Sequence, residues 1–436
     1  MINNTVTDTF YDQLSTAFQS QELLALDAHT AQLKKNAFED FEKKGFPTVK
    51  NEDWKYTNIH KLVHKDYALE SGAALAEINV ENYKIPNLDC FLVVFVNGEF
   101  QKSLSQLEGL SGLELTQIAE AENSPIFKEH FNKVIGKDAS SLVDLNTALY
   151  RQGIFIHAPK NAELAKPIHI LHVNTGNKDS FSQNRNLFVF EQHSNVEIIE
   201  TFVGEKESSA SLFNNSVSEI VVKEGANIQH YYIQHATKGS NYVSHTEIYQ
   251  EKNSLYNNFN FNFPGADFVR RDINVRLDDE NVESHLYGIN LTSEGQFVDN
   301  HTIVDHMKPH SESYEWYKNI TQDESTVVFN GKIFVREDAQ KTNAFQQNNN
   351  LMIGDKTAIY TKPQLEIFAD DVKCSHGCTM GQFDQEALFY LRSRGISEEK
   401  GRTLLIHAFA FDVTSKVENE QIRAYAENLL EEGLQI

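Results

Sequence analysis

The stretch Asn258-Phe-Asn-Phe-Asn-Phe263 alternates polar and aromatic residues with a period of two. Successive side chains of a strand point to opposite faces, so this pattern predicts a strand with three asparagines on one face and three phenylalanines on the other. Similar short β-rich runs, separated by polar or glycine turns, fill residues 150 to 380, and helical signals are nearly absent there. So long an all-β segment predicts a stacked architecture, either a β-solenoid or a large sandwich.

Asparagines favour the solenoid of these two alternatives. They stand near many of the expected turns, and three occur together at Asn348–Asn350. Asparagine tolerates the left-handed backbone conformation better than most residues, so it suits the repeated bends of a stacked fold.

Both flanks of the β segment have helical periodicity. Apolar residues spaced three to five apart predict helices from about residue 8 to Gly45. They are Phe10, Leu14, Phe18, Leu23, Leu24, Leu26, Leu33, Phe38 and Phe41. A hairpin with an Asn97-Gly98 turn follows, and a second helical patch then reaches about Leu149. We therefore expect an N-terminal helix-rich domain with a small hairpin at residues 1–148 and a β core at 149–380.

The remaining residues, 381–436, predict a C-terminal helical domain. Asp384 and Ser397 are suited to cap the first two helices, and Gly395 to end the first. A third helix is expected from about Val417 to Leu430. Such a group of short amphipathic helices suits a docking module, although it could equally cap one end of the β stack.

Composition narrows the class of protein. The 436 residues include 62 acidic and 39 basic side chains, a net charge of −23, and 40% are hydrophobic. This composition is typical of a folded globular protein. Its negative net charge disfavours nucleic acid and anionic membranes as partners. Three cysteines do not make a disulfide framework, and Met1–Asp8 has neither a basic region nor an apolar core. We therefore expect a cytoplasmic protein without a membrane helix.

The densest group of reactive residues is Cys374-Ser-His376-Gly-Cys378. On a strand its two thiols and imidazole share one face, with successive side chains about 6.5–7 Å apart. Thiolate and imidazole suit zinc, Cu(I) or iron–sulfur species, but the spacing is not that of a zinc finger. The group is therefore either half a metal site, completed by another strand or subunit, or small side chains filling a β core.

Other candidate sites are weaker. His301, His306 and His310 lie within ten residues, but His301 has the opposite strand parity, which favours structural histidines. The Arg270-Arg271-Asp272 set would suit a polysaccharide lyase. No G-x-x-x-x-G-K-[ST], G-x-S-x-G or H-E-x-x-H motif occurs, which favours a scaffold over a self-sufficient enzyme.

Residues 370–396, from Asp370-Asp-Val-Lys-Cys-Ser-His-Gly-Cys to Arg394-Gly-Ile396, resemble the C-terminal signature of the SufB/SufD family of iron–sulfur cluster assembly proteins. The preceding segments Gly331–Val335, Ala339–Ala344 and Pro363–Ile367 resemble the family's strands in the same order. Glu52-Asp-Trp-Lys-Tyr-Thr57 is similar to a segment of the SufD branch. The matches span most of the chain and are densest from about 297 to 396.

Two differences favour the SufD branch. SufD-type sequences carry Cys-Ser-His-Gly, as at Cys374–Gly377 here, where SufB-type sequences carry His-Glu-Ala-Thr. SufB-type sequences also have a cysteine proposed as a cluster ligand, whereas Gly354–Ala358 here has none. One departure is Cys378, where the family usually has alanine. It is either a third thiol at an interface or an incidental small residue.

The resemblance implies a right-handed parallel β-helix between N-terminal and C-terminal helical domains. It implies a scaffold subunit, not an enzyme, that pairs with a SufB-like paralogue and binds a SufC-like ABC-type ATPase, which hydrolyses ATP. A nascent iron–sulfur cluster would form transiently at the interface with SufB, beside His376 and Cys374. A homodimer of the isolated chain is compatible with this picture.

The expected docking of the ATPase falls on the C-terminal helices. Their candidate contact residues are Leu388, Phe389, Leu391, Leu404, Leu405, Ala408 and Phe411. Two alternatives from other classes stay open: a β-helix enzyme acting on carbohydrates, and a homo-oligomeric structural solenoid without an ATPase partner.

Overall fold

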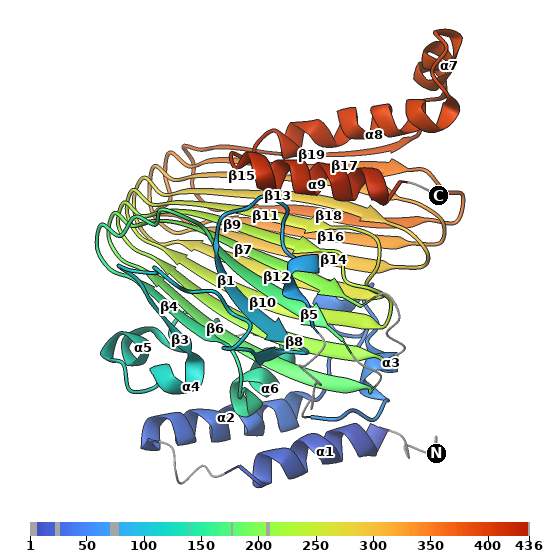
Figure 1. The fold of residues 1–436 in the computed structure, drawn as a ribbon. Helices are drawn as coiled ribbons and strands as arrows, with labels where there is room; N and C mark the ends of the chain where they lie inside the picture. The colour runs from blue at the N-terminus through green and yellow to red at the C-terminus, as the bar shows by residue number, and fades with distance from the viewer. Residues whose placement is uncertain are drawn as a thin grey trace.

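The computed structural model describes residues 7–21, 27–69, 78–137, 139–175, 178–205 and 210–434. Two sheets of strands wind into a parallel β-solenoid of about eight turns, with helices at the N-terminal and C-terminal ends (Figure 1). The expected parallel β-helix is therefore confirmed, and the sandwich alternative is wrong because the stacked strands run parallel. Leu23, Leu24 and Leu26 lie outside the described residues.

From β4 onward, strands alternate between the two sheets along the chain. The ten-stranded sheet contains β1 (Phe91–Val96), β2 (Glu99–Phe100), β5 (Ile168–Asn174), β7 (Asn195–Gly204), β9 (Asn227–Gln234), β11 (Leu255–Asn262), β13 (Glu283–Thr292), β15 (Glu312–Thr321), β17 (Asn343–Met352) and β19 (Lys373–Gln382). The nine-stranded sheet contains β3 (Glu114–Gln117), β4 (Ile154–Ala158), β6 (Ser180–Phe190), β8 (Leu212–Val222), β10 (Ser240–Gln250), β12 (Phe268–Leu277), β14 (Phe297–His306), β16 (Thr326–Val335) and β18 (Ala358–Ile367).

Residues in the left-handed conformation stack at one corner of the solenoid. Asn161, His193, Gly225, Asn253, Asn281, His310 and Lys341 all have positive φ. Each of these residues except the last donates its backbone N–H to the carbonyl of the residue that precedes the next member of the series. The N–H of Lys341 donates to the carbonyl of Asp371. Asparagine therefore serves at bends as expected, but Asn348–Asn350 do not form one, contrary to expectation, because they lie within β17.

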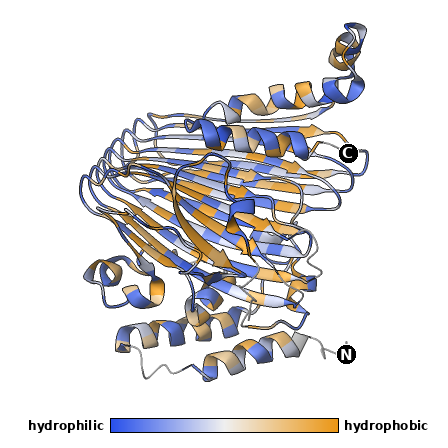
Figure 2. Ribbon diagram, in the orientation of Figure 1, coloured by the Kyte–Doolittle hydropathy of each residue, from blue (hydrophilic) through white to orange (hydrophobic). Residues whose placement is uncertain are grey.

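The interior of the solenoid is apolar along part of its width and polar along the rest. A core of residues from both sheets, including Ile198, Ile248 and Ile333, fills the apolar part. In β11 the asparagines of the opening stretch point inward, while Phe259, Phe261 and Phe263 point outward and are buried beneath the C-terminal helices. A second core thus lies outside the solenoid, between the ten-stranded sheet and the C-terminal helices. Hydrophobic residues occur along both the strands and these helices (Figure 2).

The C-terminal helices are α7 (Gln385–Ser393), α8 (Glu398–Thr414) and α9 (Glu420–Glu432). The expected caps of the first two are present: Asp384 accepts from the Ala387 N–H at 2.9 Å, and Ser397 accepts from the Lys400 N–H at 3.3 Å. The third helix begins after the cap Asn419 and not at Val417. Helices α8 and α9 pack on the ten-stranded sheet, whereas α7 projects from the body (Figure 1).

The N-terminal region covers the other end of the solenoid. Its helices are α1 (Thr7–Gln19), α2 (Ala28–Lys44), η2 (Glu52–Trp54), α3 (His60–Val63), η4 (Val80–Asn82), α4 (Ile118–Ala121), α5 (Pro125–His130) and α6 (Ser141–Leu149). The Asn97-Gly98 hairpin is confirmed, with φ of 49° and 84° at its two turn residues. Its first strand also pairs in parallel with β5, so the hairpin extends the sheet of the solenoid.

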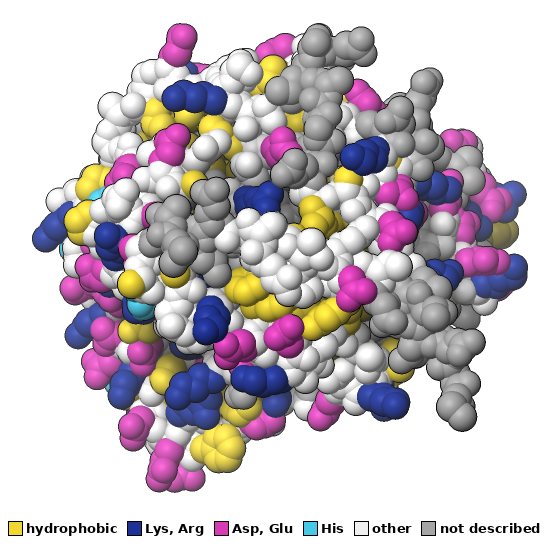
Figure 3. Space-filling view, turned by 90° about the horizontal axis from the view of Figure 1, so that it is seen from below, with side chains coloured by type: hydrophobic (Ala, Val, Ile, Leu, Met, Phe, Trp, Pro, Cys, Tyr) yellow, Lys and Arg dark blue, Asp and Glu magenta, His cyan; other side chains and the backbone are white. Residues whose placement is uncertain are grey.

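Surface charge is mixed at the N-terminal end. Lysine, arginine, aspartate and glutamate side chains lie interspersed on the face seen from below (Figure 3). Among the described residues, no helix is long and apolar enough to cross a membrane.

Candidate functional site

Strands β18 and β19 form the last turn of the solenoid, and each ends the strand order of its sheet. In the earlier turns the inward-facing side chains stack against those of the next turn, whereas no described strand stacks on β18 and β19. Strand β17 alternates buried inward-facing residues with half-buried outward-facing ones, whereas β19 is exposed along most of its length. An inward-facing residue of β19 is therefore at once part of the lumen and part of the surface.

Cys374, His376 and Cys378 occupy this open inner face. They stand in register with Ala344, Gln346 and Asn348 of β17, all of which are buried in the lumen. The three residues thus share one face of a strand. His376 and Cys378 are exposed, and Cys374 is half-buried.

The two thiols have different surroundings. Cys374 packs against the apolar core, and this burial raises the pKa of its thiol. Cys378 lies between β17 and β18, with its Sγ 3.7 Å from both Asn350 Nδ2 and Thr361 Oγ1. Cys374 is therefore partly a core residue, whereas Cys378 is a surface thiol beside polar groups.

Among the described residues, no group of three His, Cys, Asp or Glu side chains is placed to hold a metal ion. Alternate residues of one strand are too far apart to converge on one ion, because they project in parallel. Cys374, His376 and Cys378 therefore do not form a complete metal site within this chain. Half a site remains the prediction.

A ladder of asparagines runs through the lumen to the open end. Asn262, Asn290, Asn319 and Asn350 occupy equivalent positions on β11, β13, β15 and β17. Each Nδ2 donates to the Oδ1 of the next asparagine at 2.6–2.7 Å. Asn350 then donates to the Thr379 carbonyl of β19 at 2.9 Å.

Sequence reasoning missed this ladder. The signal was present in the period-two asparagines at Asn258, Asn260 and Asn262 and again at Asn348 and Asn350. The second group predicts a bend by composition, because three consecutive asparagines are more typical of turns than of strands.

A second polar column lies directly beneath His376. It consists of Glu315 on β15 and Gln346 on β17, followed in register by His376 on β19. Gln346 donates from Nε2 to the Glu315 carboxylate. No cation pairs with this carboxylate among the described side chains, and burial raises the pKa of Glu315 to about 7. Sequence analysis did not identify either residue.

The other histidines and the arginine–aspartate set serve the structure. His306 is buried in the lumen, 2.9 Å from Ser313 Oγ, and burial lowers its pKa to about 3. His301 faces outward and His310 occupies a corner, so the three histidines do not converge. Likewise, Arg270 points outward, while Arg271 stacks inside on Tyr232. The lyase set is therefore not assembled.

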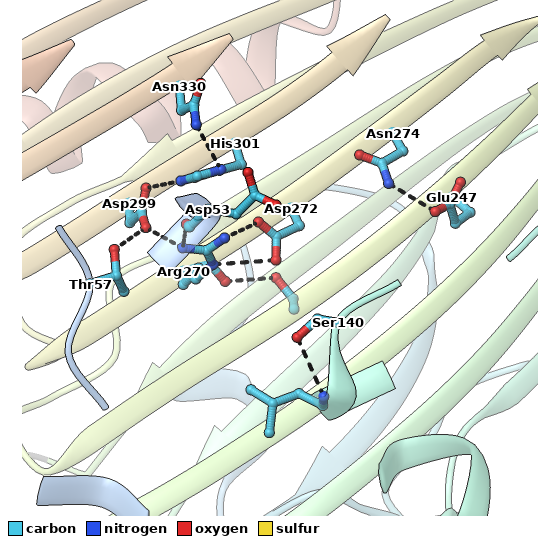
Figure 4. A network of polar contacts seen from close by, with 12 residues as sticks. Asp53, Thr57, Ser140, Glu247, Arg270, Asp272, Asn274, Asp299, His301 and Asn330 are labelled. Carbon is cyan, nitrogen blue, oxygen red and sulfur yellow. Dashed lines mark hydrogen bonds and ion pairs between the residues drawn. The ribbon is translucent and has the colours of Figure 1, made fainter. Parts of the chain in front are cut away.

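A buried network joins the N-terminal segment to the outer face of the nine-stranded sheet (Figure 4). Arg270 donates to Asp299 at 2.7 Å and to Asp272, and the Trp54 ring covers its guanidinium at 3.9 Å. Asp299 also accepts from Thr57, and it lies 3.1 Å from His301 Nε2. The segment at 52–57 that resembles the SufD branch therefore docks the N-terminal region onto the solenoid.

A cavity of about 420 Å³ lies beside this network, between residues 49–57 and strands β14, β16 and β18. His301 lines it, but Asp299 and Asn330 contact the two ring nitrogens at 3.1 and 3.3 Å. Neither nitrogen is therefore free to act on a ligand in this cavity.

The candidate docking residues divide into two sets. Phe389, Leu404, Ala408 and Phe411 are exposed, and the last three lie at spacings of four and three along α8. In contrast, Leu388 is buried and Leu391 and Leu405 are half-buried. Leu388 packs in the core between the helices and the solenoid, so it supports the helices and does not offer a contact surface.

Comparisons with known proteins agree with this architecture. The model of the SUF system FeS cluster assembly SufBD core domain matches residues 172–409, and that of the SufBD protein N-terminal region matches residues 6–170. The chain is 31% identical to an iron–sulfur cluster assembly SufBD family protein of Synechocystis, covering 85% of this chain and 84% of that protein.

Two relatives are named as iron–sulfur cluster assembly protein SufD. The chain is 29% identical to that of Escherichia coli and 25% identical to that of Bacillus subtilis, with 87% of both chains covered in each case. Because the core-domain model alone covers more than half of the chain, this protein belongs to the SufBD family of iron–sulfur cluster assembly proteins.

Proposed function

We propose that this chain is a non-catalytic scaffold subunit that pairs with a SufB-like subunit through the open last turn of its solenoid. A nascent cluster would form at that interface, beside His376 and Cys374. A SufC-like ATPase, docked on the C-terminal helices, would supply the hydrolysis of ATP. The observation that carries the proposal is the exposed inner face of β19.

Two features support pairing at this end. β18 and β19 have no strand partner on their outer edges among the described residues, so their backbone groups can accept a strand from another subunit. Apolar side chains are also exposed there: Met380 is 52% exposed and Phe368 is 60% exposed. Lys362 and Pro363 on β18 are typical of edge strands and limit indiscriminate pairing.

The C-terminal helices offer a separate surface. Leu404, Ala408 and Phe411 form a stripe on the side of α8 that faces away from the solenoid, and Phe389 on α7 is 72% exposed. Apolar residues at such spacing are typical of a helix that docks into a groove on a partner. A few of these anchors would provide most of the binding energy.

A crossed mutational experiment tests both contacts. The chain is co-expressed with its SufB-like paralogue and its SufC-like ATPase, and the recovery of each partner is measured. Met380→Glu should reduce recovery of the paralogue and leave the ATPase, whereas Phe411→Glu should do the opposite. Each introduces a charge at an exposed apolar position, so neither should unfold the chain.

Matched controls accompany the two variants. Ser375→Glu lies on the same strand as Met380 but on its outer face, and Glu399→Lys changes the charge at an exposed position on the opposite side of α8 from the stripe. Both should recover both partners. If Met380→Glu and Phe411→Glu also recover both, the two surfaces are not the contacts and the proposal is wrong.

A further inference from the structure

The floor beneath His376 contains an unpaired hydrogen-bond acceptor. Gln346 is completely buried, and its Oε1 has no hydrogen-bond partner among the described residues. A buried polar atom without a partner is uncommon, because leaving it unpaired costs roughly 1–3 kcal/mol. This oxygen therefore suggests a partner that approaches in another state of the protein.

The amide of Gln346 is held in place from two sides. Its Nε2 donates to the Glu315 carboxylate in the turn below. On the facing strand β16, Gly331 provides the space for it, since a Cβ at that position would lie 2.5 Å from Gln346 Nε2. With Nε2 committed to Glu315, Oε1 is the atom of the amide left for another partner.

His376 is the next residue of this column. It stands in direct register with Gln346, on the same inward face and one turn further along. A neutral imidazole has one N–H donor and one acceptor nitrogen, and the partner of the N–H decides which nitrogen is left. Metal-binding histidines usually donate their N–H to a carbonyl or carboxylate in this way.

We propose that Gln346, anchored by Glu315, is a positioning residue that accepts a hydrogen bond from the His376 imidazole. This bond fixes the tautomer and directs the other nitrogen out of the open end, towards the partner subunit. The inference rests on the proposed function for the role of His376, but the hydrogen bond itself belongs to this chain alone.

The test is the tautomer of His376 in the full-length chain. Histidine nitrogens are labelled with ¹⁵N, and long-range proton–nitrogen correlation spectra are assigned by comparison with His376→Ala. In the native chain we expect the two ring nitrogens of His376 to show one predominant tautomer. Gln346→Leu should change the tautomer ratio by roughly two- to tenfold, the range of one net hydrogen bond.

A second variant displaces the side-chain amide of Gln346 without replacing that residue. Gly331→Ala should displace Gln346 and change the tautomer ratio in the same direction, even if Gln346→Leu is poorly folded. Gln347→Leu is the matched control, because this neighbouring glutamine lies on the outward face of β17. It should leave the spectrum of His376 unchanged.

The outcomes separate this inference from the proposed function. If Gln346→Leu and Gly331→Ala fold but leave His376 unchanged, the inference is wrong; Gln346 Oε1 would then pair elsewhere, for example with the unpaired Asn348 Nδ2. If the tautomer changes but the native chain fails to recover a SufB-like paralogue, the hydrogen bond stands and the scaffold proposal fails.

Discussion

At the scale of single residues, His376 combines properties that are seldom found together. It is exposed, yet it belongs to a column of residues that is buried in the turns below it. Imidazole can bind iron or carry a proton near neutral pH. The open end of the solenoid thus exposes the His376 side chain, while the buried residues Gln346 and Glu315 lie directly beneath it.

We expect His376→Ala to leave the complex assembled and to slow cluster maturation by at least about tenfold, the lower end of the cost of losing support at a metal site. Maturation is measured as activation of an iron–sulfur enzyme in cells that depend on this complex. Ser375→Ala, on the outer face of β19, is the control. A normal rate with His376→Ala would remove this residue from the site.

The buried Glu315 carboxyl should make the stability of the fold depend on pH. Burial raises the pKa of Glu315 from its ordinary value of 4.5 to about 7 in the folded chain, so the folded chain binds more protons than the unfolded chain between these values. Stability contributed by this group is therefore present at acidic pH and is lost as pH rises through 7.

Glu315→Gln keeps an oxygen for Gln346 and removes the titration. Relative to this variant, the native chain should lose on the order of 2–3 kcal/mol of unfolding free energy between pH 5 and pH 8. Chemical denaturation of both proteins across this range measures the difference. A constant difference at all pH values would mean that Glu315 stays ionised in the fold.

A substitution at Asn319 tests how much the asparagine ladder in the lumen contributes to stability. Replacing it with alanine leaves Asn290 Nδ2 without its acceptor and Asn350 Oδ1 without its donor. Two unpaired buried groups should lower the unfolding free energy by roughly 2–4 kcal/mol. Gln347→Ala, which points outward from β17, should change it by less than about 1 kcal/mol. Equal effects of the two variants would show that the ladder adds little.

At the scale of elements, α8 has two distinct sides. Its outer side carries the apolar stripe, while its inner side is fastened to β15 by Lys318. The Lys318 ammonium is 2.5 Å from both the Asp412 carboxylate and the Phe409 carbonyl, and it is almost fully buried. Phe409 and Asp412 directly follow Ala408 and Phe411 of the stripe, so the residues that hold the helix against the sheet lie next to the exposed ones in the sequence.

Lys318→Met should loosen this helix without opening the sheet. Removing the ammonium leaves Asp412 without its cation, and we expect faster hydrogen exchange across α8 by roughly tenfold, which corresponds to a loss of about 1.4 kcal/mol. Exchange in β15 should change little. Lys416→Met, at an exposed lysine after α8, is the control. Unchanged exchange in α8 would mean that apolar packing alone holds it.

Much of the element order could be predicted from local patterns. Helix caps at Asp384 and Ser397 and the Asn97-Gly98 turn depend on neighbouring residues, and all three were predicted correctly. The orientation of β11 could not be predicted in the same way. Period two shows that Asn258–Phe263 has two different faces, but α8 and α9, far along the chain, decide that the phenylalanine face is buried outside.

The candidate site shows the same division. The shared face of Cys374, His376 and Cys378 follows from strand geometry and was predicted. Their exposure could not be predicted, because it depends on β19 being the last strand of its sheet. Likewise, Glu315 and Gln346 lie 61 and 30 positions before His376 and belong to no recognisable motif; only the register of the turns brings them beneath His376.

At the scale of the whole molecule, the two candidate surfaces lie near the same end. The C-terminal helices pack on β11, β13 and β15, a few strands from the open turn at β19. The N-terminal helices cover the opposite end (Figure 1). A partner on the open turn and an ATPase on α8 would therefore be neighbours. Helices α1 and α2 lie away from both contacts, whereas residues 52–57 reach β18, where Glu52 pairs with Lys362.

Native mass spectrometry tests whether this chain is one subunit of a scaffold. The chain is purified without oxygen, at its natural level, from its own cells, and the masses of the intact assemblies are measured. We expect assemblies that contain a SufB-like paralogue and an ABC-type ATPase. Recovery of the chain alone, or only as a homodimer, would contradict it.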